Sequence, residues 1–219
     1  MRTYLIAASL LVCAIPAAAQ QHGAHHGANH EHAAGGEFPA GWEGRVDRPG
    51  QQLTDVRFMA MGNGFHIITG PHVILWNPAQ SAAGAYTAAA TFKQERAPER
   101  REGFGLFVGG RDLNAEGQDY LYFLIRHDGS YMIRHRAGTE VHTLADWTQH
   151  DAIRKPTATE AASNTVAVES ADEEVRFLIN GQIVNRFARV PMLNTDGLVG
   201  FRVGHHADVH VLDFTITPR

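Results

Sequence analysis

Residues 103–147 alternate apolar and polar side chains through short consecutive runs that turn residues separate. A period of two matches a β-strand and not an α-helix, because successive side chains of a strand point to opposite faces. Leu121, Phe123 and Ile125 fall on one face of one such strand, and Tyr120, Tyr122, Leu124 and Arg126 fall on the other. The segment 127–130 then turns the chain into the next run, so the pattern predicts an antiparallel β-meander.

The same kind of run recurs along the chain from residue 57 onward. Strands are predicted at 57–61, 64–69, 73–76, 86–94, 103–109, 120–126, 131–136, 140–144, 165–169, 174–179, 182–189, 197–203 and 209–217. Four pairs favour hairpin turns because they tolerate positive φ: Asn63-Gly64, Asp128-Gly129, Asn180-Gly181 and Asp196-Gly197. Helix signals are nearly absent, so we expect an all-β fold, a two-sheet antiparallel jelly-roll sandwich, rather than a parallel α/β sheet.

The first 19 residues have the features of a signal peptide. Arg2 is followed by an apolar run from Leu5 to Ile15 and by small residues at 17–19. A lipoprotein anchor at Cys13 is the alternative, but Val12 is not the small residue that a lipobox requires before the cysteine. We expect cleavage before Gln20 and a periplasmic or secreted protein with no membrane span after cleavage.

Residues 20–37 are rich in histidine and have almost no large apolar side chain. This composition predicts a flexible tail that precedes one folded domain at 38–219. The tail histidines could converge on Cu²⁺, Ni²⁺ or Zn²⁺, or they could belong to a polar spacer that binds metal only incidentally. They are His22, His25, His26, His30 and His32.

Charge and cysteine content exclude several function classes. The chain carries 19 basic and 23 acidic residues, a net charge of −4, and loss of Arg2 with the leader gives 18 against 23, or −5. Nucleic-acid binding is therefore not expected. Cys13 is the only cysteine, so the mature chain would lack disulfides and thiol nucleophiles.

The basic groups at 96–101 and 134–136 are typical of solvated edges and loops, with an anion site as the alternative. Nothing in the sequence indicates an oligomeric state.

The order of motifs resembles the concanavalin A-like jelly-roll superfamily. The motifs are GLFVGGRD, YLYFLIRHDG, SYMIRHRAG, LADWTQHDAI, NTVAVES, EEVRFLINGQIV and DGLVGFRV, and they span roughly residues 42–217. The chain is most similar to laminin-G-like domains and to bacterial 3-keto-disaccharide hydrolases of the DUF1080 type. The resemblance implies a jelly-roll sandwich and permits either glycan recognition or glycoside hydrolysis.

Catalytic motifs of known glycan-cleaving relatives do not occur in this chain. The E-x-D-x-x-E strand of family 16 glycoside hydrolases is missing, as are G-x-S-x-G and H-E-x-x-H. The acidic cluster at 169–174 has a different spacing and falls where a hairpin turn is expected. We therefore expect noncatalytic recognition of a carbohydrate or glycan, with a hydrolase of the 3-keto-disaccharide type and metal binding through the tail as alternatives.

A sugar site needs flat apolar faces for the ring and fixed polar groups for the hydroxyls. The aromatic residues and their polar neighbours on the meander supply both, although each aromatic could instead belong to the core. The candidates are Trp76, Arg111, Asp112, Asp119, Tyr120, Tyr122, Arg126, Arg134 and Trp147.

A second histidine group lies near the C-terminus. Strand geometry would place His206, Asp208 and His210 on one face, where they could hold a metal or form part of a solvated sheet surface. His66 and His72 flank a turn and are expected to be structural.

Overall fold

The structure is a computed structural model that describes residues 38–219. The predicted signal peptide and the histidine tail, with its candidate metal ligands, lie outside the described residues. Two 3₁₀ turns, η1 (Leu53–Asp55) and η2 (Pro191–Leu193), accompany fourteen strands. The strands are β1 (Glu43–Val46), β2 (Val56–Met61), β3 (Gly64–Thr69), β4 (Val73–Ala82), β5 (Tyr86–Gln94), β6 (Phe104–Arg111), β7 (Asp119–Ile125), β8 (Ser130–Ala137), β9 (Glu140–Gln149), β10 (Ala162–Ser170), β11 (Glu174–Ile179), β12 (Gln182–Ala188), β13 (Gly197–Val203) and β14 (Asp208–Pro218).

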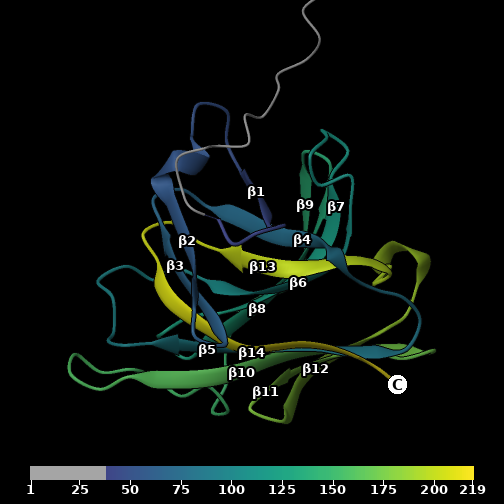
Figure 1. The fold of residues 1–219 in the computed structure, drawn as a ribbon. Helices are drawn as coiled ribbons and strands as arrows, with labels where there is room; N and C mark the ends of the chain where they lie inside the picture. Colours follow the sequence, from purple (N-terminus) through teal and green to yellow (C-terminus); the bar gives the residue numbers. More distant parts are fainter. Residues whose placement is uncertain (1–37) are drawn as a thin grey trace, which may run out of the picture.

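The strands form two seven-stranded antiparallel sheets that pack face to face (Figure 1). Sheet A has the order β1-β4-β13-β6-β7-β8-β9, and sheet B has the order β12-β11-β10-β5-β14-β3-β2. The predicted meander is confirmed as β6 to β9, and the predicted sandwich is confirmed as a whole. Strand β1, which was not predicted, is the edge strand beside β4. The described residues contain no helix with the length and apolar character that a bilayer crossing requires.

Alternation along the strands builds the core between the sheets. Every second residue of β5 and β10 is buried, from Tyr86 to Gln94 and from Ala162 to Ser170. Leu121 and Phe123 of β7 face this core, as their spacing predicts, and Phe123 packs edge-on against Phe177 of β11. Burial of such apolar side chains supplies most of the driving force for folding.

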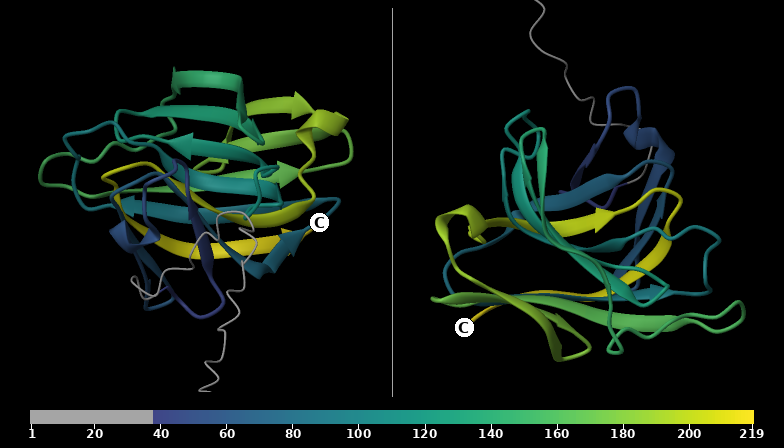
Figure 2. Two further views of the ribbon diagram at one scale, coloured as in Figure 1. Left: turned by 90° about the horizontal axis from the view of Figure 1, so that it is seen from above. Right: turned by 180° about the vertical axis from the view of Figure 1, so that it is seen from behind.

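The outer face of sheet A carries a second apolar layer. Its members are Ile74, Trp76, Phe107, Leu113, Tyr120, Tyr122, Leu124 and Met132. The sheet is bent, so that β7 and β9 rise on one side and β1 on the other, away from sheet B (Figure 2). This curvature makes the outer face concave, and three members of the second apolar layer, Tyr122, Leu124 and Met132, line the trough there.

Three of the four predicted turn pairs join hairpin partners, and one does not. Asn180 and Gly181 have φ values of 50° and 80° and connect β11 to β12, as a type I′ turn requires. At the β2–β3 turn the positive φ belongs to Gly62 instead of Asn63. The hairpin assignment of Asp196-Gly197 is wrong, because this pair lies in the crossover from β12 in sheet B to β13 in sheet A.

Candidate functional site

A groove of about 340 Å³ lies in the trough of sheet A. Strands β7, β8, β9 and β13 provide its floor and one wall, and the segments around residues 47, 72, 102 and 204 close its other end. Six arginines line it: Arg48, Arg101, Arg126, Arg134, Arg136 and Arg202.

Strand pairing sets the central part of this groove. Tyr122 of β7 lies opposite Arg134 of β8, and Leu124 lies opposite Met132. Because side chains of one parity share a face, Met132, Arg134 and Arg136 all project into the trough. The groove therefore has an apolar floor with a row of guanidinium groups above it.

Arg126 is held against an aromatic ring at the groove wall. Its guanidinium carbon lies 3.3 Å from the ring centroid of Trp147, a cation–π contact. Burial lowers the pKa of Arg126 from its ordinary value, although a guanidinium remains charged at any physiological pH. Its Nε, like the Nε of Arg134, is buried and has no hydrogen-bond partner. Both atoms are exceptions to the rule that buried donors are paired.

Arg202 and Asp47 form the buried end of the site. Nη1 of Arg202 donates to Oδ1 of Asp47 over 2.9 Å and to the Tyr120 hydroxyl over 3.0 Å. The same guanidinium lies 4.8 Å from the ring centroid of Tyr122. Burial alone would raise the pKa of Asp47, but the charge and hydrogen bonds of Arg202 lower it to about 2. Asp47 is therefore a carboxylate whose charge Arg202 already balances.

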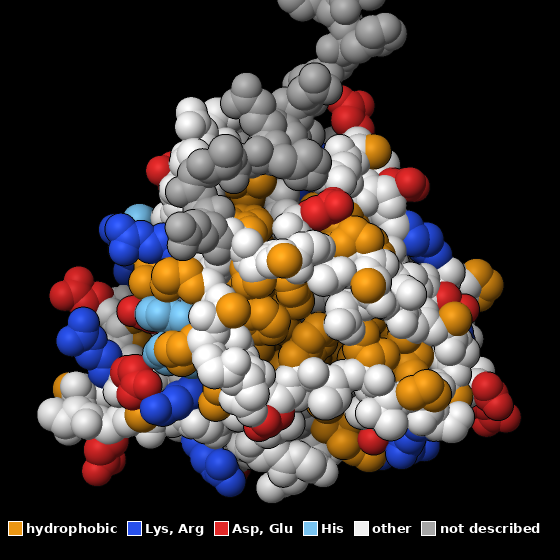
Figure 3. Space-filling view, viewed as in Figure 1, with side chains coloured by type: hydrophobic (Ala, Val, Ile, Leu, Met, Phe, Trp, Pro, Cys, Tyr) orange, Lys and Arg blue, Asp and Glu red, His pale blue; other side chains and the backbone are white. Residues whose placement is uncertain are grey.

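The groove is positively charged, although the chain as a whole carries a net charge of −4. Six arginines and two carboxylates, Asp47 and Glu102, line it. Two more carboxylates lie close to these arginines: Asp128 is 3.9 Å from Arg101 and from Arg126, and Asp146 is 3.6 Å from Arg134. The arginines thus still outnumber the nearby carboxylates by two. Acidic and basic side chains are interspersed around the face shown in Figure 3. A concentration of one sign in a low-dielectric trough attracts anions and raises their local concentration.

The structure brings together four of the nine predicted ligand residues. Tyr122, Arg126, Arg134 and Trp147 all line the groove. The other five lie elsewhere.

Trp76 and Tyr120 share the outer face of sheet A but are 2% and 0% exposed, so their rings are covered and support the floor. Arg111 and Asp119 pair with each other over 2.8 Å at the opposite end of β7 from Arg126. Seven residues of strand separate Asp119 from Arg126, roughly 20 Å. Asp112 lies in the turn that follows β6, with φ of 49°.

Sequence reasoning missed several groove residues. Arg136 shares the parity of Arg134 on β8, so the alternation could have placed it in the site. Arg101 belongs to a basic group for which a solvated loop was favoured. Arg202 and His72 come from distant segments, and no local pattern indicates that they meet the meander.

The histidine group near the C-terminus is arranged differently from the prediction. Asp208 and His210 do share the outer face of β14, but His206 lies in the preceding turn, with φ of 50°. His66 of β3, expected to be structural, takes its place. It lies opposite His210 in the sheet, and its Nε2 is 2.7 Å from Oδ1 of Asp208.

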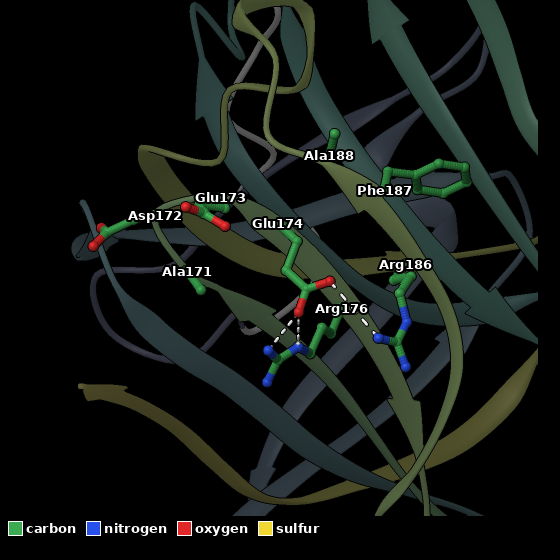
Figure 4. Close-up of a pocket in the computed structure, with 8 residues that line it drawn as sticks. All are labelled: Ala171, Asp172, Glu173, Glu174, Arg176, Arg186, Phe187 and Ala188. Atoms are coloured by element: carbon green, nitrogen blue, oxygen red, sulfur yellow. Dashed lines mark hydrogen bonds and ion pairs between the residues drawn. The ribbon is translucent and has the colours of Figure 1, made fainter.

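A larger hollow, of about 590 Å³, lies beside β11 and β12 (Figure 4). Three of its five charged side chains, Glu174, Arg176 and Arg186, are engaged with one another. Glu174 pairs with Arg176, and its other oxygen lies 3.9 Å from Nη1 of Arg186. Both of its arginines are thus engaged with Glu174, so this hollow offers little free positive charge to an anion, and the groove of sheet A is the stronger candidate for one.

Comparisons with known proteins place the fold. No family model matches the chain, and no curated protein matches it. Among solved structures, the carbohydrate binding module CBM66 from Bacillus subtilis is similar, with 10% identity, a TM-score of 0.58 and coverage of 81% of this chain and 95% of that one. The carbohydrate recognition domain of Emp47p has 11% identity and a TM-score of 0.57 over 82% of this chain and 89% of that one.

A protein of unknown function with a galectin-like fold, also from Bacillus subtilis, has 11% identity and a TM-score of 0.57 over 81% of this chain and 89% of that one. At these identities the likeness concerns the fold. It confirms the expected two-sheet jelly-roll sandwich, whereas the concanavalin A-like, laminin-G-like and DUF1080 assignments stay predictions.

Proposed function

We propose that this protein is a noncatalytic carbohydrate-binding domain and that its ligand is an anionic glycan held in the groove of sheet A. The observation that carries the proposal is the set of six arginines around an apolar floor. Uronic-acid carboxylates and sugar sulfates match a guanidinium fork in charge and geometry.

The shape of the groove fits a small part of a glycan chain. Its volume of about 340 Å³ falls in the range of small-molecule sites, roughly 300–1,000 Å³. Trp147 adds half-buried aromatic surface beside the charged groups, whereas Tyr122 is 4% exposed and belongs to the floor. Two of the structural neighbours are described as a carbohydrate binding module and a carbohydrate recognition domain, which supports a sugar over another anion.

A further part of the proposal concerns location. The leader-like residues 1–19 support action in the periplasm or outside the cell, where acidic polysaccharides are accessible. Hydrolysis of a 3-keto-disaccharide and metal binding by the tail stay predictions from the sequence.

The proposal is tested by measuring affinity for polygalacturonate, a sulfated polysaccharide, neutral dextran and polyphosphate. We expect binding to one or both acidic polysaccharides and none to dextran. Arg126→Gln and Arg134→Gln should each weaken binding about ten-fold or more, because a hydrogen bond to a charged group contributes about 1.5–3 kcal/mol. Arg111→Gln is the matched control, since it removes the same charge at the far end of the sheet.

Equal binding by Arg134→Gln and Arg111→Gln would reject the groove as the site. Equal affinity for polyphosphate would show recognition of charge without a sugar and would contradict carbohydrate specificity. Binding to dextran that neither arginine variant changes would move the site elsewhere on the domain.

A further inference from the structure

Three segments that are distant in sequence bring His72, Glu102 and His205 together at the closed end of the groove. His72 lies between β3 and β4, Glu102 precedes β6, and His205 follows β13. One ligand-type atom from each lies within 4.8 Å of the others. Two imidazoles and one carboxylate form a donor set typical of Zn²⁺ and of other borderline divalent ions.

The geometry of this cluster differs from that of an ordinary hydrogen-bonded group. Nδ1 of His205 lies 2.9 Å from Oε1 of Glu102, yet the nitrogen is buried and makes no hydrogen bond of acceptable geometry. The His72 and His205 rings are only 3.7 Å apart between centroids. Ligands about 2.0–2.1 Å from a tetrahedral ion stand about 3.3 Å apart, so small side-chain rotations close the set.

Backbone hydrogen bonds fix the three segments to one another. The Gly204 amide donates to the Gly103 carbonyl over 2.7 Å, which joins the segments of His205 and Glu102. Thr69 ties the His72 segment to the same turn, because its hydroxyl donates to the Gly204 carbonyl and its amide donates to the Ala207 carbonyl. Metal sites whose ligands are held in place in this way lose little ordering entropy on binding.

Close packing at Gly204 allows this approach. A Cβ atom there would lie 2.8 Å from Oε2 of Glu102 and 2.9 Å from the Gly103 carbonyl oxygen. Glycine is therefore the residue that lets the Glu102 carboxylate come near His205.

From this arrangement we propose that His72, Glu102 and His205 bind one divalent transition-metal ion, with Zn²⁺ as the best match. Three protein ligands leave at least one coordination position for water or a ligand group. His72 and Glu102 also line the groove, so that position is reached from it. The proposal stands apart from the proposed function, because the ion binds without a sugar.

The second histidine cluster, His66 with Asp208 and His210, is the internal comparison. Its His66 nitrogen is already hydrogen-bonded to Asp208, and its two rings stack nearly parallel, 4.2 Å apart with 18° between planes. Parallel rings direct their nitrogen atoms side by side instead of toward one point. We therefore assign the ion to the His72 cluster.

The test has two measurements. Elemental analysis gives the amount of Zn²⁺ that the protein retains after dialysis, and the visible absorption spectrum is recorded after the protein is loaded with Co²⁺. The full chain is used, with glutamine in place of all five tail histidines so that the tail does not contribute. In this five-histidine variant we expect one retained ion per chain. After loading with Co²⁺ we expect an absorption spectrum typical of an ion that is bound by few ligands, all of them nitrogen or oxygen atoms.

His72→Gln and Glu102→Gln should each lower Zn²⁺ affinity about ten-fold or more, since loss even of an outer-shell partner commonly costs that much. His66→Gln and His142→Gln are the matched controls and should retain the ion. Melting curves verify that each variant is folded. Equal retention by all four variants, no retention by the background chain, or loss only with His66→Gln would each overturn the assignment.

Discussion

The buried pair of Arg202 and Asp47 links the stability of the domain to the groove of sheet A. The Arg202 side chain is 9% exposed and that of Asp47 is 19% exposed, and both make several hydrogen bonds. A charge buried this far is tolerated only while its partner is present. The pair therefore fixes one guanidinium of the groove before any ligand binds.

The titration of Asp47 predicts how stability depends on pH. Its pKa is about 2 in the folded domain against an ordinary 3.8, so its contribution is present above pH 3.8 and is lost as pH falls through 2. The loss is on the order of 2 kcal/mol. Denaturant unfolding at several pH values measures it.

Asp47→Asn is the companion variant for that measurement. Its free energy of unfolding at neutral pH should be about 3–5 kcal/mol lower, because Arg202 is left without its counter-charge. Its free energy of unfolding should also lack the dependence on pH between 3.8 and 2. Glu95→Gln, at an exposed pair with Lys93, should cost less than about 1 kcal/mol. A variant slope equal to that of the wild type would contradict the assignment to Asp47.

At the scale of elements, the hairpin of β11 and β12 shows how turn chemistry fixes register. Asn180 has φ of 50°, and its side chain accepts from the Thr165 amide and donates to the Ala152 carbonyl. Gly181 follows with φ of 80° and has open space around it. The turn thus depends on backbone conformation at Gly181 and on side-chain bonds at Asn180.

Gly181→Ala should lower the free energy of unfolding by about 1–2 kcal/mol, the cost of a left-handed conformation with a Cβ atom. Gly117→Ala is the matched control, because Gly117 also has open space but no positive φ, and it should leave stability unchanged or slightly raised. Thermal or denaturant melts compare the two. Equal effects at both positions would show that strain at Gly181 is not the cause.

Local patterns predicted the strands well because the period of two is visible within a few residues. Strand β1 escaped prediction because Glu43–Val46 is short, charged and without alternation. Tyr122 and Arg134 could be placed in one site because β7 and β8 are joined by a tight turn. Arg202 could not, because its neighbour in the sheet is Gly105, about a hundred residues earlier, and no local pattern encodes that pairing.

The same limit applies to the histidines. His66 pairs with His210 across two strands that are distant in sequence, and His72 meets His205 through two separate turns. Sequence spacing grouped His206 with its neighbours because they are adjacent in the chain. The fold groups histidines by which strands pair, and that information is nonlocal.

For the whole molecule, the position of β14 decides whether sheet B is continuous. This last strand lies inside sheet B, where it pairs with β3 on one side and β5 on the other. Val209 and Val211 of β14 are both fully buried in the core.

Removal of residues 208–219 should prevent cooperative folding, because β3 and β5 then lose their common partner and sheet B is divided. Loss of a single cooperative thermal transition, followed by circular dichroism, is the expected result. Removal of Arg219 alone is the control and should cost about 1–2 kcal/mol at most, since it breaks one surface ion pair with Glu169 and one terminal backbone hydrogen bond to Ala85. A cooperative melt in the longer truncation would show that the two parts of the sheet fold without β14.

The strand order also has a consequence for biosynthesis. Because the chain is made from its N-terminus, β2 and β3 leave the ribosome early and wait for β14, the last strand to emerge, before sheet B can close. Completion of sheet B is therefore a late event, which follows the emergence of residues 208–218.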